Sequence, residues 1–384
     1  MNRLHLLSWF PTPEDPTLGN FCIRMIQSLP ADCHSVILSV CEGNQKSPML
    51  RTLNEEGFVH LQYSMQLPRN PLLRKIRYLQ LYQRGLKHLR RHYFEPDLIH
   101  LHVAHPLGQL ARLWHRIYGY PYVLTEHWTV YQPQNRALFK GKLKRSIVHT
   151  GKQAALILPV SRDLQRCMES YGIHNRYRVI YNLVDTSLFQ PGTPSETSGK
   201  KRVLHISTLK DEAKNFSGIL HAVERLRRQR DDFELHVIHD YPAPDFEDYV
   251  RAHQLSDCVF FHGKKSSAEV AEAMASAHFF LLFSHFENLP CVIVEAFAAG
   301  LPVLATDVGG IAEMVTSERG ILIQDGDENA LLNGMNRLLD RADTYDRQGI
   351  RAYALQTFSR EKIGARIYQA YQEVLEQKNT VPGK

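Results

Sequence analysis

The stretch FLLFSHFENLPCVIVEAFAAGLPVLATDVGG, residues 280–310, decides the expected fold of the chain. An apolar strand opens it, and the short loop that follows carries Glu287. Pro290 stands where the first helical residue is expected, and Gly300 ends the helix. Glu295 is the one charged side chain of that apolar helix, where a carboxylate is costly unless it is hydrogen-bonded. Strand, helix and second strand in this order indicate a parallel α/β sheet.

The two glutamates are expected at one edge of that sheet. Glu287 lies at the strand end, and Glu295 lies roughly one and a half turns into the helix. Open α/β folds bind ligands at the carboxyl edge of the sheet, where both residues fall. The helix N-terminus adds main-chain N–H groups of Leu289, Cys291 and Val292, which suit a phosphate. The stretch therefore predicts a site for a phosphate-bearing ligand.

The same alternation of strands and helices runs through both halves of the chain. In the first half, strands are expected at 4–10, 36–40, 98–103, 122–125 and 155–160, with helices at 19–28, 72–93 and 107–118. In the second half, strands are expected at 203–207, 234–239, 259–262, 279–284, 302–305 and 320–323, with helices at 216–228, 268–277, 290–299 and 330–340. Parallel sheets with helical crossovers follow from this order.

The length of 384 residues favours two domains, because single cores stop growing at roughly 250–300 residues. We expect two doubly wound, Rossmann-like α/β domains that face a central cleft, the natural ligand site. The first domain covers 1–189, and the second covers 201–358. The Pro- and Gly-containing run QPGTPSETSGK at 190–200 is the expected linker. A final amphipathic helix over 359–377 is expected to pack back on the first domain.

Charge divides the chain unevenly. Residues 1–190 hold 24 Lys and Arg against 12 Asp and Glu, whereas the remainder holds 22 against 28. The segment 69–92 contains no acid and many cations. Its apolar residues at helical spacing are Leu72, Leu73, Ile76, Leu79 and Leu86. One interpretation is a core-facing helix with a solvated basic face. The interpretation we favour is docking onto anionic lipid, reinforced by Lys140, Lys142, Lys144 and Arg145.

The sequence predicts a cytoplasmic protein that lies peripherally on the inner face of the membrane. No apolar run approaches the roughly 20 residues of a spanning helix. The apolar start ends at Pro11 without a small-residue cleavage site, so it reads as a first strand and not as a signal peptide. Six cysteines without a C-x-x-C pair fit reduced thiols. Nucleic acid is not an expected partner, because no recognition motif accompanies the basic charge.

Two patterns invite a metal interpretation, which the sequence does not favour. His100, His102 and His105 form H-x-H-x-x-H, and the first two share a strand face. The one acid nearby is Asp97, so contact of His102 or His105 with an acceptor is the better hypothesis. The Asp-Gly-Asp run at 325–327 follows a strand and precedes a helix, so its last residue is expected in a turn or as a helix cap. No metal and no cofactor are expected.

Longer motifs around the two glutamates resemble those of the retaining glycosyltransferases of family 4. These residues are Glu287-x7-Glu295 within FENLP and EAFAAGLPVLAT, followed by VGGIAEMV at 308–315. VIYNLVDTSLF at 179–189 is similar to the hinge motif of the family, and the loop around Gly19 is similar to its early glycine loop. The resemblance covers nearly the whole chain and is densest in the second half. It implies the two-domain GT-B fold.

The resemblance also implies roles in binding a nucleotide-diphosphate sugar, the donor substrate. Glu287 would contact the transferred sugar near its reacting carbon, and Glu295 would hold the ribose hydroxyls of the nucleotide. The main-chain N–H groups after Glu287 would bind donor sugar and phosphate. This assigns Asn288, Leu289 and Pro290 to the donor site.

Transfer with retention through an oxocarbenium-like state requires charge stabilisation on the departing pyrophosphate more than a protein nucleophile. In the family, an arginine and a lysine after the first strand of the second domain supply this charge. In HISTLKDEAKNFSGIL, which starts at His205, Lys214 matches the lysine. Thr208 holds the position of the arginine, and Lys210 is the nearby candidate for the second cation.

Three further positions follow from the resemblance. His127 in LTEHW lies at a strand end, where family members carry a histidine that faces the donor sugar. Gly19 would let the backbone approach the diphosphate. Side chains near Gly263 and Glu287 would select sugar and nucleotide. The pair at 309–310 is either a turn or a point of close ligand approach, and the sequence favours neither.

The resemblance implies a metal-independent, hexosyltransferase-like enzyme of cell-surface polysaccharide assembly. It would move a sugar from the nucleotide sugar to a glycan or a polyprenyl-linked acceptor. The donor would bind the acidic second domain, and the acceptor would approach the basic first domain. One alternative is a nucleotide-sugar epimerase of GT-B type. The other is an inactive protein that binds glycans or nucleotide sugars, which the missing arginine alone supports.

Overall fold

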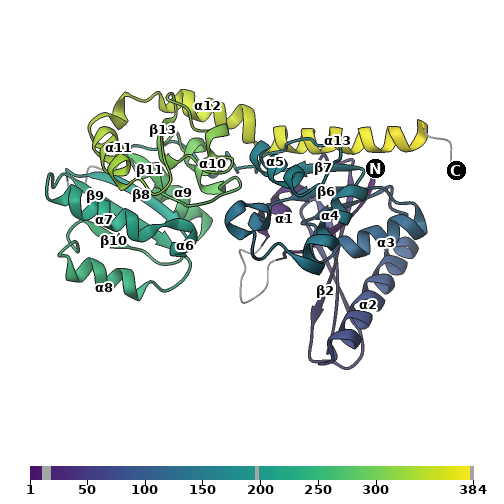
Figure 1. Ribbon diagram of the computed structural model, residues 1–384. Coiled ribbons are helices and arrows are strands. Elements are labelled where there is room, and N and C mark those ends of the chain that lie inside the picture. The colour runs from purple at the N-terminus through teal and green to yellow at the C-terminus, as the bar shows by residue number, and fades with distance from the viewer. Residues whose placement is uncertain (11–18, 195–198, 381–384) are drawn as a thin grey trace. The chain divides into compact units, whose positions relative to one another are not determined.

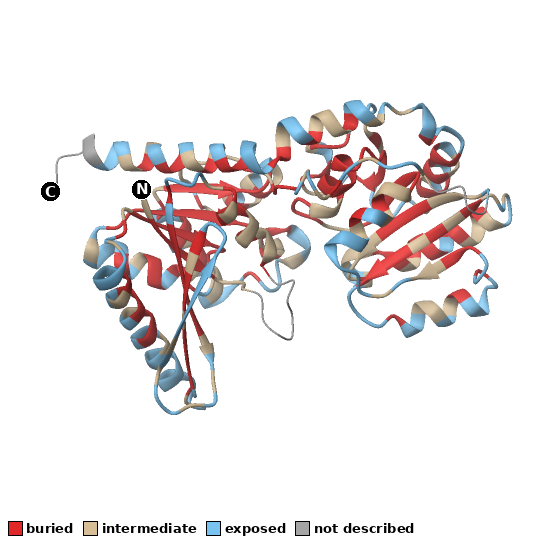
Figure 2. Cartoon of the chain, turned by 180° about the vertical axis from the view of Figure 1, so that it is seen from behind, coloured by how far each residue is buried: buried red, intermediate tan, exposed pale blue. Residues whose placement is uncertain are grey.

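The chain folds into two compact units, each a sheet with helices on both faces (Figure 1). The computed structural model describes residues 1–10, 19–194 and 199–380. The first unit is Met1–Tyr181 with Glu361–Lys384, and the second is Asn182–Arg360. Most strands are buried in both sheets, β3 of the first sheet being exposed, whereas the helices alternate buried and exposed residues (Figure 2).

Two sequence expectations fall partly outside the described residues. The loop before Gly19, with Pro11, Pro13 and Pro16, is one, and residues 195–198 of the expected linker are the other. Within the described ranges, no helix combines the length and the apolar character that crossing a bilayer requires.

The first unit contains a seven-stranded sheet in the order β3-β4-β2-β1-β5-β6-β7. Its strands are β1 Asn2–Leu7, β2 His34–Glu42, β3 Met49–Glu55, β4 Phe58–Met65, β5 Leu98–His102, β6 Tyr122–Glu126 and β7 Leu156–Pro159. Neighbouring strands pair in parallel except β3 with β4. Every strand expected in this half is present. The antiparallel hairpin is an addition, because β3 is a mostly exposed edge strand without an apolar run.

Helices cover both faces of this sheet. They are α1 Asn20–Gln27, α2 Pro71–His92, α3 Gly108–Tyr118, α4 Gly141–Gln153, α5 Arg162–Ser170 and α13 Arg360–Thr380, with 3-10 turns η1 Thr129–Tyr131 and η2 Pro133–Asn135. The last of them, α13, packs on the first unit, where the hydroxyl of Tyr371 lies 2.6 Å from Nδ1 of His100. Arg366, also on α13, donates to the carbonyl of Val179 at 2.9 Å.

Helix α2 begins at a proline, and the Asn70 side chain accepts from the N–H groups of Leu72 and Leu73 at 3.0 and 3.2 Å. The expected stripe of five apolar residues is only partly buried. Leu86 is fully buried, whereas Leu72, Leu73, Ile76 and Leu79 are exposed. The core-facing interpretation is therefore correct for the second half of the helix and wrong for its first two turns, which are exposed on every side.

The second unit contains a six-stranded parallel sheet in the order β10-β9-β8-β11-β12-β13. Its strands are β8 Lys201–Ser207, β9 Phe233–His239, β10 Val259–Phe261, β11 Phe279–Leu282, β12 Val303–Thr306 and β13 Gly320–Ile323. Its helices are α6 Asp211–Lys214, α7 Phe216–Arg227, α8 Pro244–Ala252, α9 Ser267–Ser276, α10 Cys291–Ala298, α11 Glu328–Arg341 and α12 Arg347–Phe358, with 3-10 turns η3 Ile311–Glu313 and η4 Ala342–Thr344. Every expected strand is present. Pro290 is the N-cap of α10 and not its first helical residue.

Both strand orders contain a switch point, where the chain turns from one side of the first strand to the other. In the second unit it lies between β8 and β11, and in the first it lies between β1 and β5. Doubly wound sheets bind ligands beyond the carboxyl ends of the strands at such points. The prediction of two doubly wound α/β domains is confirmed, and it directs attention to these two edges.

Candidate functional site

A small hollow of about 270 Å³ opens at the switch point of the second unit. We call it the edge hollow. The residues that line it come from the ends of β8 and β9, from the segment before α9 and from the start of α10. Its polar and charged lining residues are Ser207, Thr208, Lys214, His239, Asp240, Lys265 and Glu287, and Pro290 lines it at the start of α10. The structure thus brings together Lys214, Glu287 and Pro290, which the sequence assigned to one site.

Glu287 lies in the loop between β11 and α10 and is only 7% exposed. Its Oε1 accepts a hydrogen bond from the Ser284 hydroxyl at 2.8 Å and forms an ion pair with the ammonium of Lys214. The hydroxyl of Thr306, at the end of β12, donates to the carbonyl of Ser284 at 2.6 Å. The ends of two strands, β11 and β12, therefore position this carboxylate, and its charge is compensated by a lysine from α6.

The glycine pair at 309–310 fixes the loop that carries Glu287. Gly309 has a φ of +56°, and a Cβ there would lie 1.8 Å from the carbonyl oxygen of Glu287. The N–H of Gly310 donates to the carbonyl of Asn288 at 2.8 Å. The sequence left open whether this pair forms a turn or a point of close ligand approach. In the structure, the main chain of Gly309 lies close to the carbonyl of Glu287, and only glycine fits there.

Asn182 is a site residue to which the sequence gave no task. It belongs to the VIYNLVDTSLF motif, is nearly buried, and donates through Nδ2 to the carbonyl of Leu289 at 2.8 Å. Together with Gly310, it anchors the segment that leads from Glu287 into α10. The sequence could have indicated this role, because an asparagine inside an apolar motif is expected to be buried and a buried amide requires hydrogen-bond partners.

The start of α10 contributes the electropositive end of a helix dipole. Pro290, its N-cap, has no side-chain acceptor, and Cys291 and Val292 of the first turn line the edge hollow. Main-chain N–H groups at such a start suit an anion. Glu295 lies one turn further along α10, is nearly buried, and is not among the residues that line the hollow.

Beside Lys214, the lysine that lines the edge hollow is Lys265, and the donor contact expected of Lys210 stays a prediction. Lys210 is exposed, its ammonium lies 5.5 Å from the ring centroid of Tyr241, and it does not line the hollow. Lys265 lines the hollow and forms an ion pair with Glu269 at 2.9 Å. In the sequence, Lys265 can be recognised because it directly precedes the S-x-x-E capping box at the start of α9.

Gly263 lies after β10 with a φ of +64°, and nothing would obstruct a Cβ there. Its carbonyl accepts from the main-chain N–H of His239, a residue that lines the edge hollow, at 3.2 Å. Gly263 therefore supports the rim of the hollow through its backbone. The selection of sugar and nucleotide near this position stays a prediction.

In the first unit, Gly19 is the N-cap of α1 with a φ of +74°. A Cβ there would lie 2.4 Å from the carbonyl oxygen of Trp9, so the backbone that Gly19 admits closely is that of Trp9. His127 directly follows β6, and its ring centroid lies 4.3 Å from that of Phe21. Burial lowers the pKa of His127 well below its usual value, so its imidazole is neutral at neutral pH.

Glu126, next to His127, is a buried carboxylate that was not predicted as a site residue from the sequence. It accepts from the main-chain N–H groups of Ala104, His127 and Trp128 at 3.1, 2.9 and 3.0 Å. The hydroxyl of Tyr131 adds a fourth bond at 2.8 Å. Burial raises the pKa of Glu126, whereas these four donors oppose the rise. This carboxylate organises the loop that presents His127.

The two sequence patterns that invited a metal interpretation are Asp-Gly-Asp at 325–327 and the histidines at 100–105, and their contacts in the structure differ. Asp327 caps α11 by accepting from the N–H of Ala330 at 2.8 Å, so its expected capping role is confirmed. Asp325 lies 2.6 Å from Nδ1 of His285. His100 and His102 do share a strand face, with ring centroids 3.9 Å apart.

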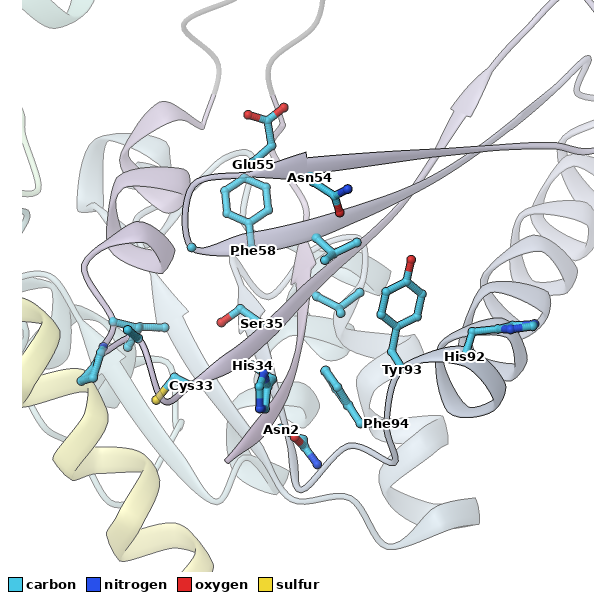
Figure 3. Close-up of a pocket in the computed structure, with 16 residues that line it drawn as sticks. Asn2, Cys33, His34, Ser35, Asn54, Glu55, Phe58, His92, Tyr93 and Phe94 are labelled. Carbon is cyan, nitrogen blue, oxygen red and sulfur yellow. The ribbon is translucent and has the colours of Figure 1, made fainter.

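A hollow of about 810 Å³ in the first unit lies at the opposite edge of its sheet (Figure 3). It is lined by the amino ends of β1 and β2, the β3–β4 turn and the end of α2, including Asn2, His34, Glu55, Phe58 and Tyr93. Doubly wound sheets bind ligands at the carboxyl edge. Its size therefore does not make it the better candidate.

Comparisons with known proteins identify the family of the chain. A model described as Glycosyltransferase Family 4 matches residues 18–188, and one described as Glycosyl transferases group 1 matches residues 200–341. An MMP alpha-(1->4)-mannosyltransferase of Mycolicibacterium hassiacum is 32% identical over 50% of the chain and 47% of its own length. A putative teichuronic acid biosynthesis glycosyltransferase of Bacillus subtilis is 26% identical over 66% of the chain and 64% of its own length.

Among solved structures, HepE of Anabaena in complex with UDP superposes with a TM-score of 0.73. It is 18% identical and covers 97% of the chain and 100% of its own chain, so this likeness shows the fold alone. The chain spans about half to two thirds of the length of the first two curated relatives.

Proposed function

Because the chain belongs to the group 1 and family 4 glycosyltransferases and has the GT-B fold, we propose that it transfers a sugar, with retention, from a nucleoside-diphosphate sugar bound at the edge hollow. The observation that carries this proposal is the Lys214–Glu287 ion pair at the switch point, beside the start of α10. The HepE structures, solved with UDP or UDP-glucose, support a donor of this chemical class.

In this proposal the pyrophosphate of the donor lies against the start of α10, between Lys214 and Lys265. Negative charge grows on the leaving phosphate as the bond to the sugar breaks, and two fixed ammonium groups stabilise it. Lys265 supplies the second cation, since Thr208 holds the position where the family carries arginine. Glu287 orients the Lys214 ammonium and contacts the sugar, and Glu295 holds the ribose. No metal ion takes part.

The test is transfer from a panel of nucleotide sugars by the full chain, with Glu287→Gln as the variant. A thermal-shift screen first identifies the donor, since a ligand that binds the folded state raises the melting temperature. Glu318→Gln is the matched control, because Glu318 is an exposed carboxylate of the same unit. We expect Glu287→Gln to lose at least about 100-fold in kcat and the control to retain wild-type transfer.

Equal transfer by Glu287→Gln and wild type would refute the assignment. Donor conversion to an isomer without any acceptor would identify an epimerase, and donor binding without turnover over a broad acceptor panel would identify a binding protein. Either result would replace the proposed function.

We also propose that α2 docks the protein on anionic lipid, so that a lipid-linked acceptor reaches the first unit. Leu72, Leu73 and Ile76 are 67%, 54% and 44% exposed at the start of this helix. Its first turns also carry Arg74 and Lys75, both exposed. Exposed leucines among cations, on a helix without any acid, suit insertion at a headgroup boundary.

Flotation with vesicles of phosphatidylglycerol and phosphatidylcholine tests this surface. Leu72→Ser with Ile76→Ser should abolish flotation, and added salt should weaken that of the wild type. Leu355→Ser is the control, since Leu355 is an exposed leucine of the second unit. Unchanged flotation of the double variant would exclude α2 as the docking element.

A further inference from the structure

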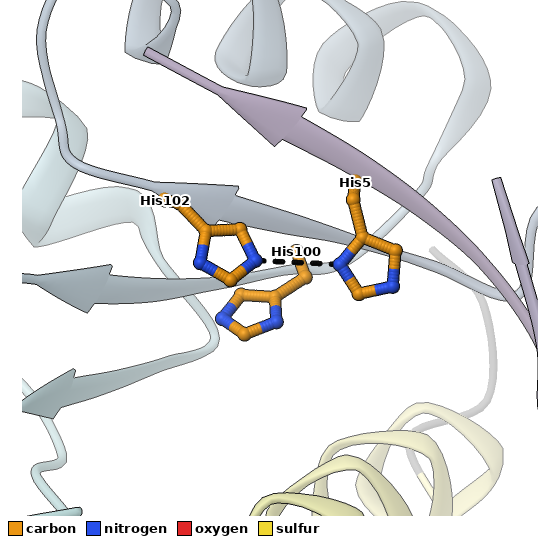
Figure 4. Close-up of side chains that lie close together, drawn as sticks. All are labelled: His5, His100 and His102. Atoms are coloured by element: carbon orange, nitrogen blue, oxygen red, sulfur yellow. Dashed lines mark hydrogen bonds between the residues drawn. The ribbon is translucent and has the colours of Figure 1, made fainter. Parts of the chain in front are cut away.

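Four histidines and a cysteine lie together in the first unit, toward the carboxyl edge of its sheet. They come from four elements: His5 from β1, His100 and His102 from β5, His127 from the end of β6, and Cys22 from α1. Two triplets each place one ligand atom per residue within 4.8 Å of the others. The first is His5, His100 and His102 (Figure 4), and the second is Cys22, His102 and His127.

The first triplet is a hydrogen-bonded network. Nδ1 of His100 lies 2.6 Å from the hydroxyl of Tyr371, and Nε2 lies 2.6 Å from Oγ1 of Thr125. Both nitrogens of this ring are therefore engaged by hydroxyl groups. His100 would have to give up one of these bonds to coordinate an ion.

His102 differs from His100, because one of its two ring nitrogens has no hydrogen-bond partner among the described residues. Arg3 donates to Oγ of Ser35 at 3.1 Å, and Nε2 of His5 lies 3.3 Å from the same oxygen. When His5 also donates to Ser35, its Nδ1 accepts from Nε2–H of His102, 3.3 Å away (Figure 4). Nδ1 of His102 then carries a bare lone pair, and within the described residues it has no hydrogen-bond partner.

An unsatisfied lone pair inside a fully buried side chain is costly. A neutral imidazole with a lone pair available, held through its other nitrogen by a neighbour, is the form in which histidine binds a metal ion.

We propose that Cys22, His102 and His127 together bind one Zn²⁺ ion. A thiolate and two imidazoles are the donors that Zn²⁺ prefers, and three protein ligands leave a fourth position for water or substrate oxygen. Zinc bonds of about 2.0–2.3 Å place ligand atoms about 3.5 Å apart. In the structure the three ligand atoms lie within 4.8 Å of one another, so small side-chain rotations bring them to this spacing. His5 acts as the outer partner that orients His102.

The test measures zinc bound to the purified full chain by elemental analysis and by competition with a chromophoric chelator. Cys22→Ser and His102→Asn each remove a ligand, and Cys33→Ser removes another buried thiol outside the triplet. We expect one zinc per chain in wild type and in Cys33→Ser, and a loss in affinity of at least about 100-fold in the two ligand variants. Cobalt should give a sulfur-to-metal absorption band that Cys22→Ser lacks.

Equal zinc content in all four proteins, or none in any, would overturn the site, provided that circular dichroism shows each variant folded. A His5→Phe variant gives a second check, since loss of the outer partner should weaken zinc by about 10–100-fold without removing a ligand.

Discussion

Replacing Lys214 with methionine removes the cation from Glu287 and keeps the aliphatic stem of the side chain. The two side chains are 20% and 10% exposed, so the pair is closer to a buried ion pair than to a surface one. Breaking a buried pair from one side costs roughly 3–5 kcal/mol, against roughly 0–1 kcal/mol at the surface. Ser284 still donates to the carboxylate, so we expect the loss near the lower end, about 3 kcal/mol.

The reverse variant should cost less. Glu287→Gln leaves Lys214 without its partner, but the lysine is the more exposed of the two and has a flexible stem that reaches water. We expect about 1–2 kcal/mol for this change. The double variant, Lys214→Met with Glu287→Gln, contains no unpaired charge, so it should recover most of the stability that Lys214→Met loses.

Thermal unfolding monitored on the second unit measures these differences. In a domain of this size, 1 kcal/mol shifts the melting temperature by about 2–4 °C, so Lys214→Met should melt about 6–12 °C below wild type. Transfer should fall at least about 100-fold in all three variants, including the stable double variant. Additive losses in the double variant, or a smaller loss in Lys214→Met than in Glu287→Gln, would refute this account of the pair.

Three further outcomes follow from the contacts of single residues. Gly309→Ala should cost at least about 2 kcal/mol in urea unfolding and should reduce transfer, because its Cβ meets the Glu287 carbonyl; full activity would contradict this. Asp327→Ala should cost about 1 kcal/mol, seen as a small drop in melting temperature, and should leave transfer intact, since the residue only caps α11. Acid should destabilise the fold from about pH 6.5 downward. Burial lowers the pKa of His102 to about 3 and that of His60 to about 4 in the folded chain. The unfolded chain therefore binds more protons than the folded chain in this range, so the free energy of unfolding rises with pH. His60→Gln should flatten that slope in unfolding measured from pH 4 to 7, and an unchanged slope would rule out its contribution.

Local sequence order was sufficient for the strands and helices around the edge hollow. The strand that ends before Ser284, the proline at the start of α10 and Gly300 at its end are signals within a few residues of one another. They place Glu287 at a sheet edge in any doubly wound arrangement. The hairpin of β3 and β4 gave no such signal, because an exposed edge strand needs no apolar run.

The sequence by itself determined the two parallel sheets, the loop that carries Glu287 and the match of Lys214, since each rests on neighbours in the chain. Only the tertiary structure decided which lysine faces the edge hollow, because Lys265 and Lys210 follow different strands and only Lys265 lines it. It also decided that the start of α2 is exposed and that Cys22, His102 and His127 meet. These relations depend on strand order and on the packing of helices against the sheet, which bring together residues from separate crossovers.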